Sequence, residues 1–158
     1  MIGELEMTKV MAVGVFDLLH AGHLHYVEQA KSLGDELIVV VAHDDTVRKQ
    51  KHEPITGHEL RCRMVKGLKP VDSAIVGNPP STPIFKILEK IKPDIIALGY
   101  DQKHSIDSVR SGLDKHGFKS VKIIRVDGLS DDLDGTRKII SKILDLWPNN
   151  EGGPYEED

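Results

Sequence analysis

Residues 10–34 read VMAVGVFDLLHAGHLHYVEQAKSLG, and this stretch decides the fold. Its first four residues, VMAV, are all apolar, as in a strand of a parallel sheet that is covered on both faces. Gly14 ends that run, and apolar residues then recur at helical spacing up to Gly34. These helical positions are Leu24, Val27, Ala30 and Leu33. The stretch therefore predicts a strand, a glycine turn and a helix.

Two histidines, His20 and His23, stand three positions apart at the start of the predicted helix. Side chains at this spacing lie on one face of a helix. The first turn of a helix also presents unpaired backbone N–H groups and the positive end of the helix dipole, both of which favour a phosphate. We therefore expect an anion-binding site at this turn.

The composition indicates one domain and gives no sign of several classes of partner. A chain of 158 residues has the usual size of a single domain. The formal net charge of -4 gives no reason to expect a nucleic acid or an anionic membrane as a partner. The single cysteine, Cys62, cannot form an internal disulfide. Because the chain also lacks a signal peptide and an apolar run of roughly 18 residues, we expect a cytoplasmic protein.

Short apolar segments alternate with segments of helical periodicity along the rest of the chain. Further strands are predicted at residues 36–42, 73–76, 94–99 and 121–126, and further helices across 60–68, 84–91, 106–117 and 136–146. The segments 43–52 and 77–83 are predicted to be loops. This alternation is typical of a three-layer, Rossmann-like, doubly wound α/β sheet of five mainly parallel strands. We expect the domain to span residues 1–147 and the acidic residues 148–158 to form a disordered tail.

In a doubly wound sheet the first strand lies beside the switch point, where ligands bind outside the carboxyl ends of the strands. The predicted first and fourth strands should therefore face one crevice. The polar residues that this topology brings within reach of one ligand are His20, His23, Lys49, Lys51 and Asp101.

The sequence GVFDLLHAGH, residues 14–23, resembles the G-x-F-D-x-x-H-x-G-H signature of the cytidylyltransferase-like nucleotidyltransferases. The order of predicted elements agrees with that family from residue 9 to about residue 146. Two segments, LKPVD at 68–72 and KPDIIALGYDQ at 92–102, are similar to the archaeal FAD synthases within it. The resemblance implies transfer of AMP from ATP to FMN. Two alternatives stay open: a glycerol-3-phosphate cytidylyltransferase, which shares the signature, and a nucleotide-binding domain without catalytic activity.

The resemblance also implies roles for single residues. His20 and His23 would bind the nucleotide phosphates and stabilise charge as pyrophosphate leaves, and Lys49 and Lys51 would reach the same phosphates. Arg61 and Arg137 would bind the substrate. The implied nucleotide-binding positions are Val15, Phe16, His20, Ala21, Gly22, His23, Asp101 and Thr136. The late family motif I-S-T-S/T-x-x-I is replaced here by DGTRKI at 134–139, of which only Thr136 and Ile139 fit.

The chemistry favours the same residue types. Attack by a phosphate oxygen on an α-phosphoryl group needs in-line positioning and donors aimed at oxygens that gain charge. A divalent ion, most plausibly Mg²⁺, would bridge the phosphates with one carboxylate, Asp17 or Asp101, because magnesium keeps several of its waters. Asp17 could instead orient the turn by hydrogen bonding. The family often forms homodimers, and the sequence leaves the oligomeric state open.

Overall fold

The computed structural model describes residues 6–148, and five strands in this part of the chain form one parallel sheet. The strands are β1 (Lys9–Gly14), β2 (Glu36–Val41), β3 (Ser73–Val76), β4 (Ile95–Leu98) and β5 (Lys122–Arg125). They lie in the order β3-β2-β1-β4-β5, so β1 is central. The chain adds β2 and β3 on one side of β1 and then β4 and β5 on the other, which places the switch point between β1 and β4. The predicted doubly wound sheet is confirmed, with each of its expected strands present.

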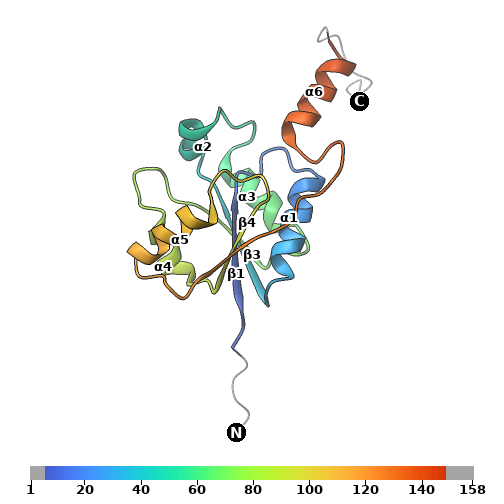
Figure 1. Ribbon diagram of the computed structural model, residues 1–158. Coiled ribbons are helices and arrows are strands. Elements are labelled where there is room, and N and C mark those ends of the chain that lie inside the picture. Colours follow the sequence, from blue (N-terminus) through green and yellow to red (C-terminus); the bar gives the residue numbers. More distant parts are fainter. Residues whose placement is uncertain (1–5, 149–158) are drawn as a thin grey trace.

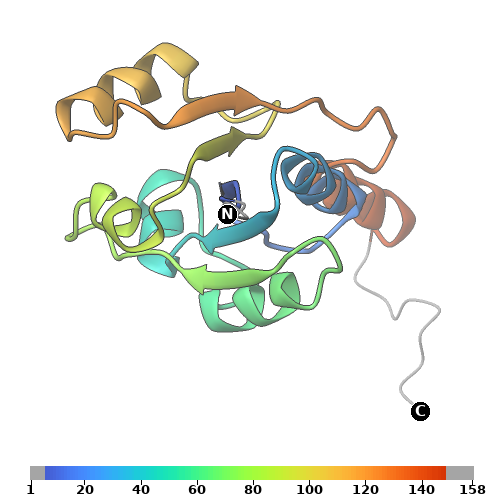
Figure 2. The ribbon, with the colours of Figure 1, turned by 90° about the horizontal axis from the view of Figure 1, so that it is seen from below.

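Helices cover both faces of the sheet (Figures 1 and 2). They are α1 (Ala21–Lys31), α2 (Asp44–Gln50), α3 (His58–Lys66), α4 (Phe85–Ile91), α5 (Ile106–Lys115) and α6 (Thr136–Leu146). Buried side chains of α1 and α3 pack in one core cluster, and those of α4 and α5 pack in another. The sheet separates the two clusters, which makes the predicted three layers.

The alternation of side chains along β1 shows why a wholly apolar run is needed. Val10 and Ala12 point into the cluster under α1, whereas Met11 points into the cluster under α4. Residues on both faces of this strand are therefore removed from water, as expected for the central strand of a parallel sheet.

The segment after β2 differs from the prediction. Residues 43–52 were expected to form a loop, but most of them form the short helix α2. The His43 side chain caps its start by accepting a hydrogen bond from the Asp45 backbone N–H, at 3.2 Å. Arg48 then pairs with Asp45 one turn earlier and with Glu53 beyond the helix. Because these local polar contacts stabilise α2, apolar periodicity does not reveal it.

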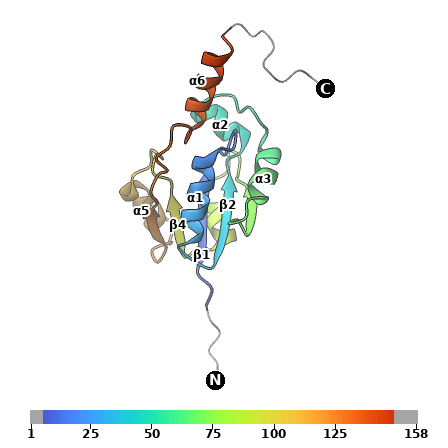
Figure 3. The same ribbon diagram turned by 90° about the vertical axis from the view of Figure 1, so that its right-hand side faces the viewer.

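The last helix, α6, extends away from the sheet (Figures 1 and 3). It has the predicted bounds, but none of its residues is buried. No helix in the described part of the chain is long and apolar enough to cross a membrane. The predicted tail lies, apart from Pro148, outside the described residues.

Candidate active site

The turn after β1 adopts an uncommon backbone conformation that its side chains hold in place. Phe16 and Leu18 both have positive φ angles, 57° and 51°, which cost energy for residues with a Cβ. The Phe16 ring is buried, folds back over Gly14 and stacks on Tyr26 with 6.1 Å between ring centroids. A Cβ atom at Gly14 would meet the Phe16 ring at 2.8 Å, so glycine is required there. The signature glycine and phenylalanine thus shape the turn together.

Asp17 fixes this turn to the segment before α3. Its carboxylate is 6% exposed and accepts hydrogen bonds from the backbone N–H of Ile55 at 2.6 Å and of Thr56 at 3.1 Å. The Thr56 hydroxyl donates a third bond, at 2.8 Å. Burial opposes ionisation, but these bonds outweigh it and lower the pKa of Asp17. Both oxygens are therefore occupied, and the structure favours the orienting role over metal ligation.

Arg61 does not lie where the resemblance implied. Its side chain is 0% exposed, so its guanidinium cannot contact a substrate in this structure. It donates to the carbonyl oxygens of Val15 at 2.6 Å, Thr56 at 2.8 Å and Ala42 at 3.0 Å. It also pairs with the Asp44 carboxylate. The expected contact of Arg61 with the substrate is therefore corrected. The buried guanidinium of Arg61 links the turn after β1 to the turn after β2.

His20 and His23 cap the start of α1 and stack on each other, with ring centroids 3.8 Å apart. His20 Nδ1 accepts a hydrogen bond from the Gly22 backbone N–H at 3.1 Å, and His23 Nδ1 accepts one from the His20 backbone N–H at 3.3 Å. These two backbone donors are thus already paired, contrary to the expectation that they face an anion. Since Nδ1 accepts in both rings, each neutral ring carries its proton on Nε2.

The Nε2 atoms remain available for a ligand. Of the side-chain nitrogen and oxygen atoms in residues 6–148, only Nε2 of His25 is buried without a hydrogen-bond partner. Neither Nε2 of His20 nor that of His23 bonds to a described residue, so both reach solvent. The pair therefore presents two N–H donors at the carboxyl end of the central strand.

The protonation state of the pair follows from its burial. Burial lowers the pKa of His23 to about 4, and the nearby His20 and Lys51 add to this effect while Asp17 opposes it. Burial also lowers the pKa of His20, against the carboxylates of Asp134 and Asp101. Both rings are therefore neutral donors near pH 7.

The remaining predicted residues surround the histidines unequally. Lys51 lies close enough to affect the pKa of His23, and Asp101 does the same for His20. The Thr136 hydroxyl donates to the Asp17 carbonyl oxygen at 3.1 Å, which places the start of α6 beside the turn. Side chains that are exposed at the surface belong to Lys49, Lys51, Asp101, Arg137 and Ala21.

Two side-chain hydrogen bonds hold the ends of β1 and β4 together at the switch point of the sheet. The buried Tyr26 hydroxyl donates to the Ala97 carbonyl oxygen of β4 at 2.7 Å, and burial raises the pKa of this phenol. Gln102 Nε2 donates to the Val13 carbonyl oxygen of β1 at 2.7 Å. The ends of β1 and β4 are thus joined, as the predicted crevice requires.

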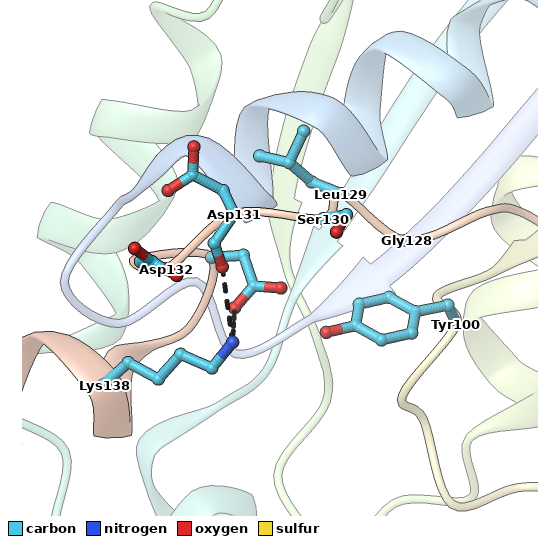
Figure 4. Close-up of a pocket in the computed structure, with 8 residues that line it drawn as sticks. Tyr100, Gly128, Leu129, Ser130, Asp131, Asp132 and Lys138 are labelled. Atoms are coloured by element: carbon cyan, nitrogen blue, oxygen red, sulfur yellow. Dashed lines mark hydrogen bonds and ion pairs between the residues drawn. The ribbon is translucent and has the colours of Figure 1, made fainter.

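A hollow of about 520 Å³ lies beside His20, between Tyr100 and the segment 128–134 (Figure 4). Lys138 from α6 enters it and pairs with Asp134 at 2.6 Å. The Asp134 carbonyl oxygen lies against α1, since a Cβ atom at Gly22 would meet it at 2.1 Å. The sequence did not single out Asp134 or Lys138 because they stand in the segment that departs from the family motif.

A divalent ion has few protein ligands to use here. No group of three His, Cys, Asp or Glu side chains that could hold a metal ion occurs within residues 6–148. The Asp17 oxygens are occupied, which leaves the exposed carboxylate of Asp101 beside His20. The site therefore fits an ion such as Mg²⁺ that is held mainly by phosphates and water.

A model of one protein family, described as cytidylyltransferase-like, matches residues 11–143. The chain belongs to this family. The match spans the signature turn and the paired histidines and confirms the resemblance seen in the sequence.

Proteins named FAD synthase are similar to this chain over almost their whole length. The one from Methanobrevibacter ruminantium is 50% identical over 154 residues, which cover 95% of this chain and 96% of that protein. The one from Aciduliprofundum boonei is 49% identical over 140 residues, covering 88% and 92%.

Solved structures agree on the fold. A protein of Thermoplasma volcanium, titled a lipopolysaccharide core biosynthesis protein, superimposes with a TM-score of 0.75 at 45% identity and covers 79% of this chain and 100% of its own. Pantothenate synthetase from Thermus thermophilus superimposes with a TM-score of 0.59 at 14% identity, covering 80% of this chain and 57% of that one. The second likeness shows the fold alone.

Proposed function

We propose that this protein is an FAD synthase, which transfers AMP from ATP to FMN and releases pyrophosphate. The observation that carries the proposal is the stacked pair His20 and His23, whose Nδ1 atoms are fixed by backbone and whose Nε2 atoms face solvent. The FAD synthases that resemble the chain at 43% to 50% identity supply the substrate pair.

The reaction needs little covalent work from the protein. An oxygen of the FMN phosphate attacks the α-phosphorus of ATP, the new P–O bond forms, and the bond to the β-phosphate oxygen breaks. The phosphate of FMN is already ionised near pH 7, so no base has to remove a proton from it. The Nε2–H groups of His20 and His23 donate to oxygens that gain charge as pyrophosphate leaves.

The other residues are proposed to act on the same phosphates. Lys49 in α2 and Lys51, which caps the end of that helix close to His23, would bind the departing phosphates as flexible cations. The hollow beside Tyr100 would take the nucleoside, and Asp101 and Thr136 would contact the nucleotide from the turns near His20 and Asp17. Arg137 on the exposed side of α6 would contact the acceptor. The proposed nucleotide contacts of the turn itself are Val15, Phe16, Ala21 and Gly22, of which buried Phe16 can offer only its backbone.

Mg²⁺ would neutralise charge on the phosphates, with Asp101 as its carboxylate partner. Arg61 and Asp17 act indirectly, because they hold the turn that carries the histidines. They are positioning residues.

The test is pyrophosphate release from ATP or CTP with FMN, glycerol 3-phosphate or other phosphorylated alcohols. We expect release with ATP and FMN, accompanied by FAD. Release with CTP and glycerol 3-phosphate alone would favour a cytidylyltransferase, and nucleotide binding without release from any acceptor would favour an inactive domain.

Removing the histidine donors gives the matched variants. We expect His20→Ala and His23→Ala each to lower kcat by about a hundredfold or more while the circular dichroism spectrum is kept, since one donor at a developing charge contributes on this scale. His104→Ala, an exposed histidine outside the site, serves as the control.

A further inference from the structure

One apolar surface beside the site has no partner in the described structure. Helix α6 has no buried residue, and its apolar side chains gather at a spacing of three to four residues. Ile140 is 38% exposed and Ile143 is 46% exposed. The apolar positions of the helix are Ile139, Ile140, Ile143, Leu144 and Leu146. A helix with such a face normally buries it against something.

The position of α6 ties this face to the chemistry. Its first residue, Thr136, donates to the carbonyl oxygen of Asp17 in the turn that carries the histidines. At about 1.5 Å per residue, Ile140 lies about 6 Å and Ile143 about 10 Å along the helix from that contact. The apolar face therefore begins about 6 Å along the helix from its contact with the turn that precedes the histidines.

A second exposed apolar side chain is linked to the same turn. Ile55 is 64% exposed, and its backbone N–H donates to the Asp17 carboxylate at 2.6 Å. Asp17 thus contacts α6 through its carbonyl oxygen and the Ile55 segment through its carboxylate. Two segments with exposed apolar side chains are thus both hydrogen-bonded to Asp17.

We propose that the first turns of α6 and Ile55 bind the isoalloxazine ring of the acceptor, an inference that rests on the proposed function. The ring is flat and uncharged and its dimethylbenzene part is apolar, whereas the residues around His20 and in the adjacent hollow are mostly polar or charged. The ribityl chain of FMN separates phosphate from ring by a length comparable to the distance from Thr136 to Ile140. Phosphate at the histidines and ring at α6 can therefore be bound together, while the nucleoside occupies the hollow beside Tyr100.

The test compares kinetic constants of the full chain with Ile140→Ser combined with Ile143→Ser, and separately Ile55→Ser. The control is Met7→Ser, because Met7 is 63% exposed and precedes the amino end of β1, whereas the histidines follow its carboxyl end. We expect the KM for FMN to rise about tenfold in the two α6 and Ile55 variants, as the loss of buried apolar area implies. The KM for ATP, kcat and all constants of Met7→Ser should stay unchanged.

Several results would overturn the inference while leaving the proposed function intact. The first such result is that the α6 variant forms FAD with an unchanged KM for FMN. A changed mass in solution for that variant is another, because the face would then join two copies of the chain. Failure of the unaltered protein to form FAD would instead refute the proposed function. Binding of FMN, read from its own fluorescence, would then decide the inference separately: equal affinity in the unaltered and α6 proteins overturns it.

Discussion

At the scale of single residues, the nitrogen atoms of His20 and His23 divide into two groups with different tasks. The Nδ1 atoms accept backbone hydrogen bonds and fix the rings, and the Nε2 atoms are left to donate. A neutral ring suits this arrangement, because a protonated Nδ1 would face a backbone N–H group. Burial supplies that neutrality by lowering the pKa of both rings.

The lowered pKa of His23 predicts a loss of stability in weak acid. Its pKa falls from 6.5 in the unfolded chain to about 4 in the folded one, so below pH 6.5 the unfolded state binds more protons. The free energy of unfolding should therefore fall by about 2 kcal/mol between pH 7 and pH 5 on account of this residue. Urea denaturation at both pH values measures it. In His23→Gln the fall should be smaller by that amount, and an equal fall in both proteins would contradict the assignment.

Asp17 yields a prediction that separates its two possible roles. In Asp17→Asn one acceptor oxygen becomes an NH₂ group facing backbone donors, so the free energy of unfolding should fall by about 2 kcal/mol. The Mg²⁺ concentration for half-maximal activity should not change, whereas it should rise in Asp101→Asn. A rise in Asp17→Asn with undiminished stability would show instead that Asp17 ligates the metal.

At the scale of elements, the site depends on a contact between two strand-to-helix turns. Arg61 on α3 binds carbonyl oxygens of the turns after β1 and β2, and Asp44 at the start of α2 holds the same guanidinium. His58 accepts a bond from the Asp44 backbone N–H at 3.2 Å. Helices α2 and α3 and the turns after β1 and β2 are thus joined around this guanidinium.

Replacing Arg61 should therefore lower the stability of the fold, and it should not remove a direct contact with the substrate. Lysine cannot reach the carbonyls of Val15, Thr56 and Ala42 together, so we expect Arg61→Lys to lower the free energy of unfolding by about 3 kcal/mol. The exposed Arg63 on the same helix gives the matched control, Arg63→Lys, with a change within about 0.5 kcal/mol. A stable Arg61→Lys protein with a raised KM would restore the substrate-binding role.

These elements also show what the sequence could and could not predict. Continuous apolar runs located β1, β2 and β4, whose side chains are buried on both faces of the sheet, and the G-x-F-D-x-x-H-x-G-H signature located the histidine pair. Helix α2 was missed because caps and ion pairs stabilise it. The burial of Arg61 was missed because no local pattern marks a charged side chain whose partners come from three separate segments.

At the scale of the whole molecule, the order of strands brings the two halves of the site together. The central strand β1 delivers the histidines, and β4 beside it delivers Tyr100 and Asp101. The chain after β5 returns across α1, where the Asp134 carbonyl oxygen lies over Gly22, and continues into α6. Residues more than a hundred positions apart, such as Asp17 and Thr136, thereby come into contact.

In the proposed reaction FMN is the attacking group and the attack occurs at the α-phosphorus of the nucleotide. Incubation of the protein with FMN and ATP labelled with ³²P at either the α or the γ position tests this most directly. If AMP is transferred to FMN, the α label appears in FAD and the γ label appears only in pyrophosphate. Transfer of the γ label to the flavin, or retention of all α label in nucleotides without flavin, would contradict it.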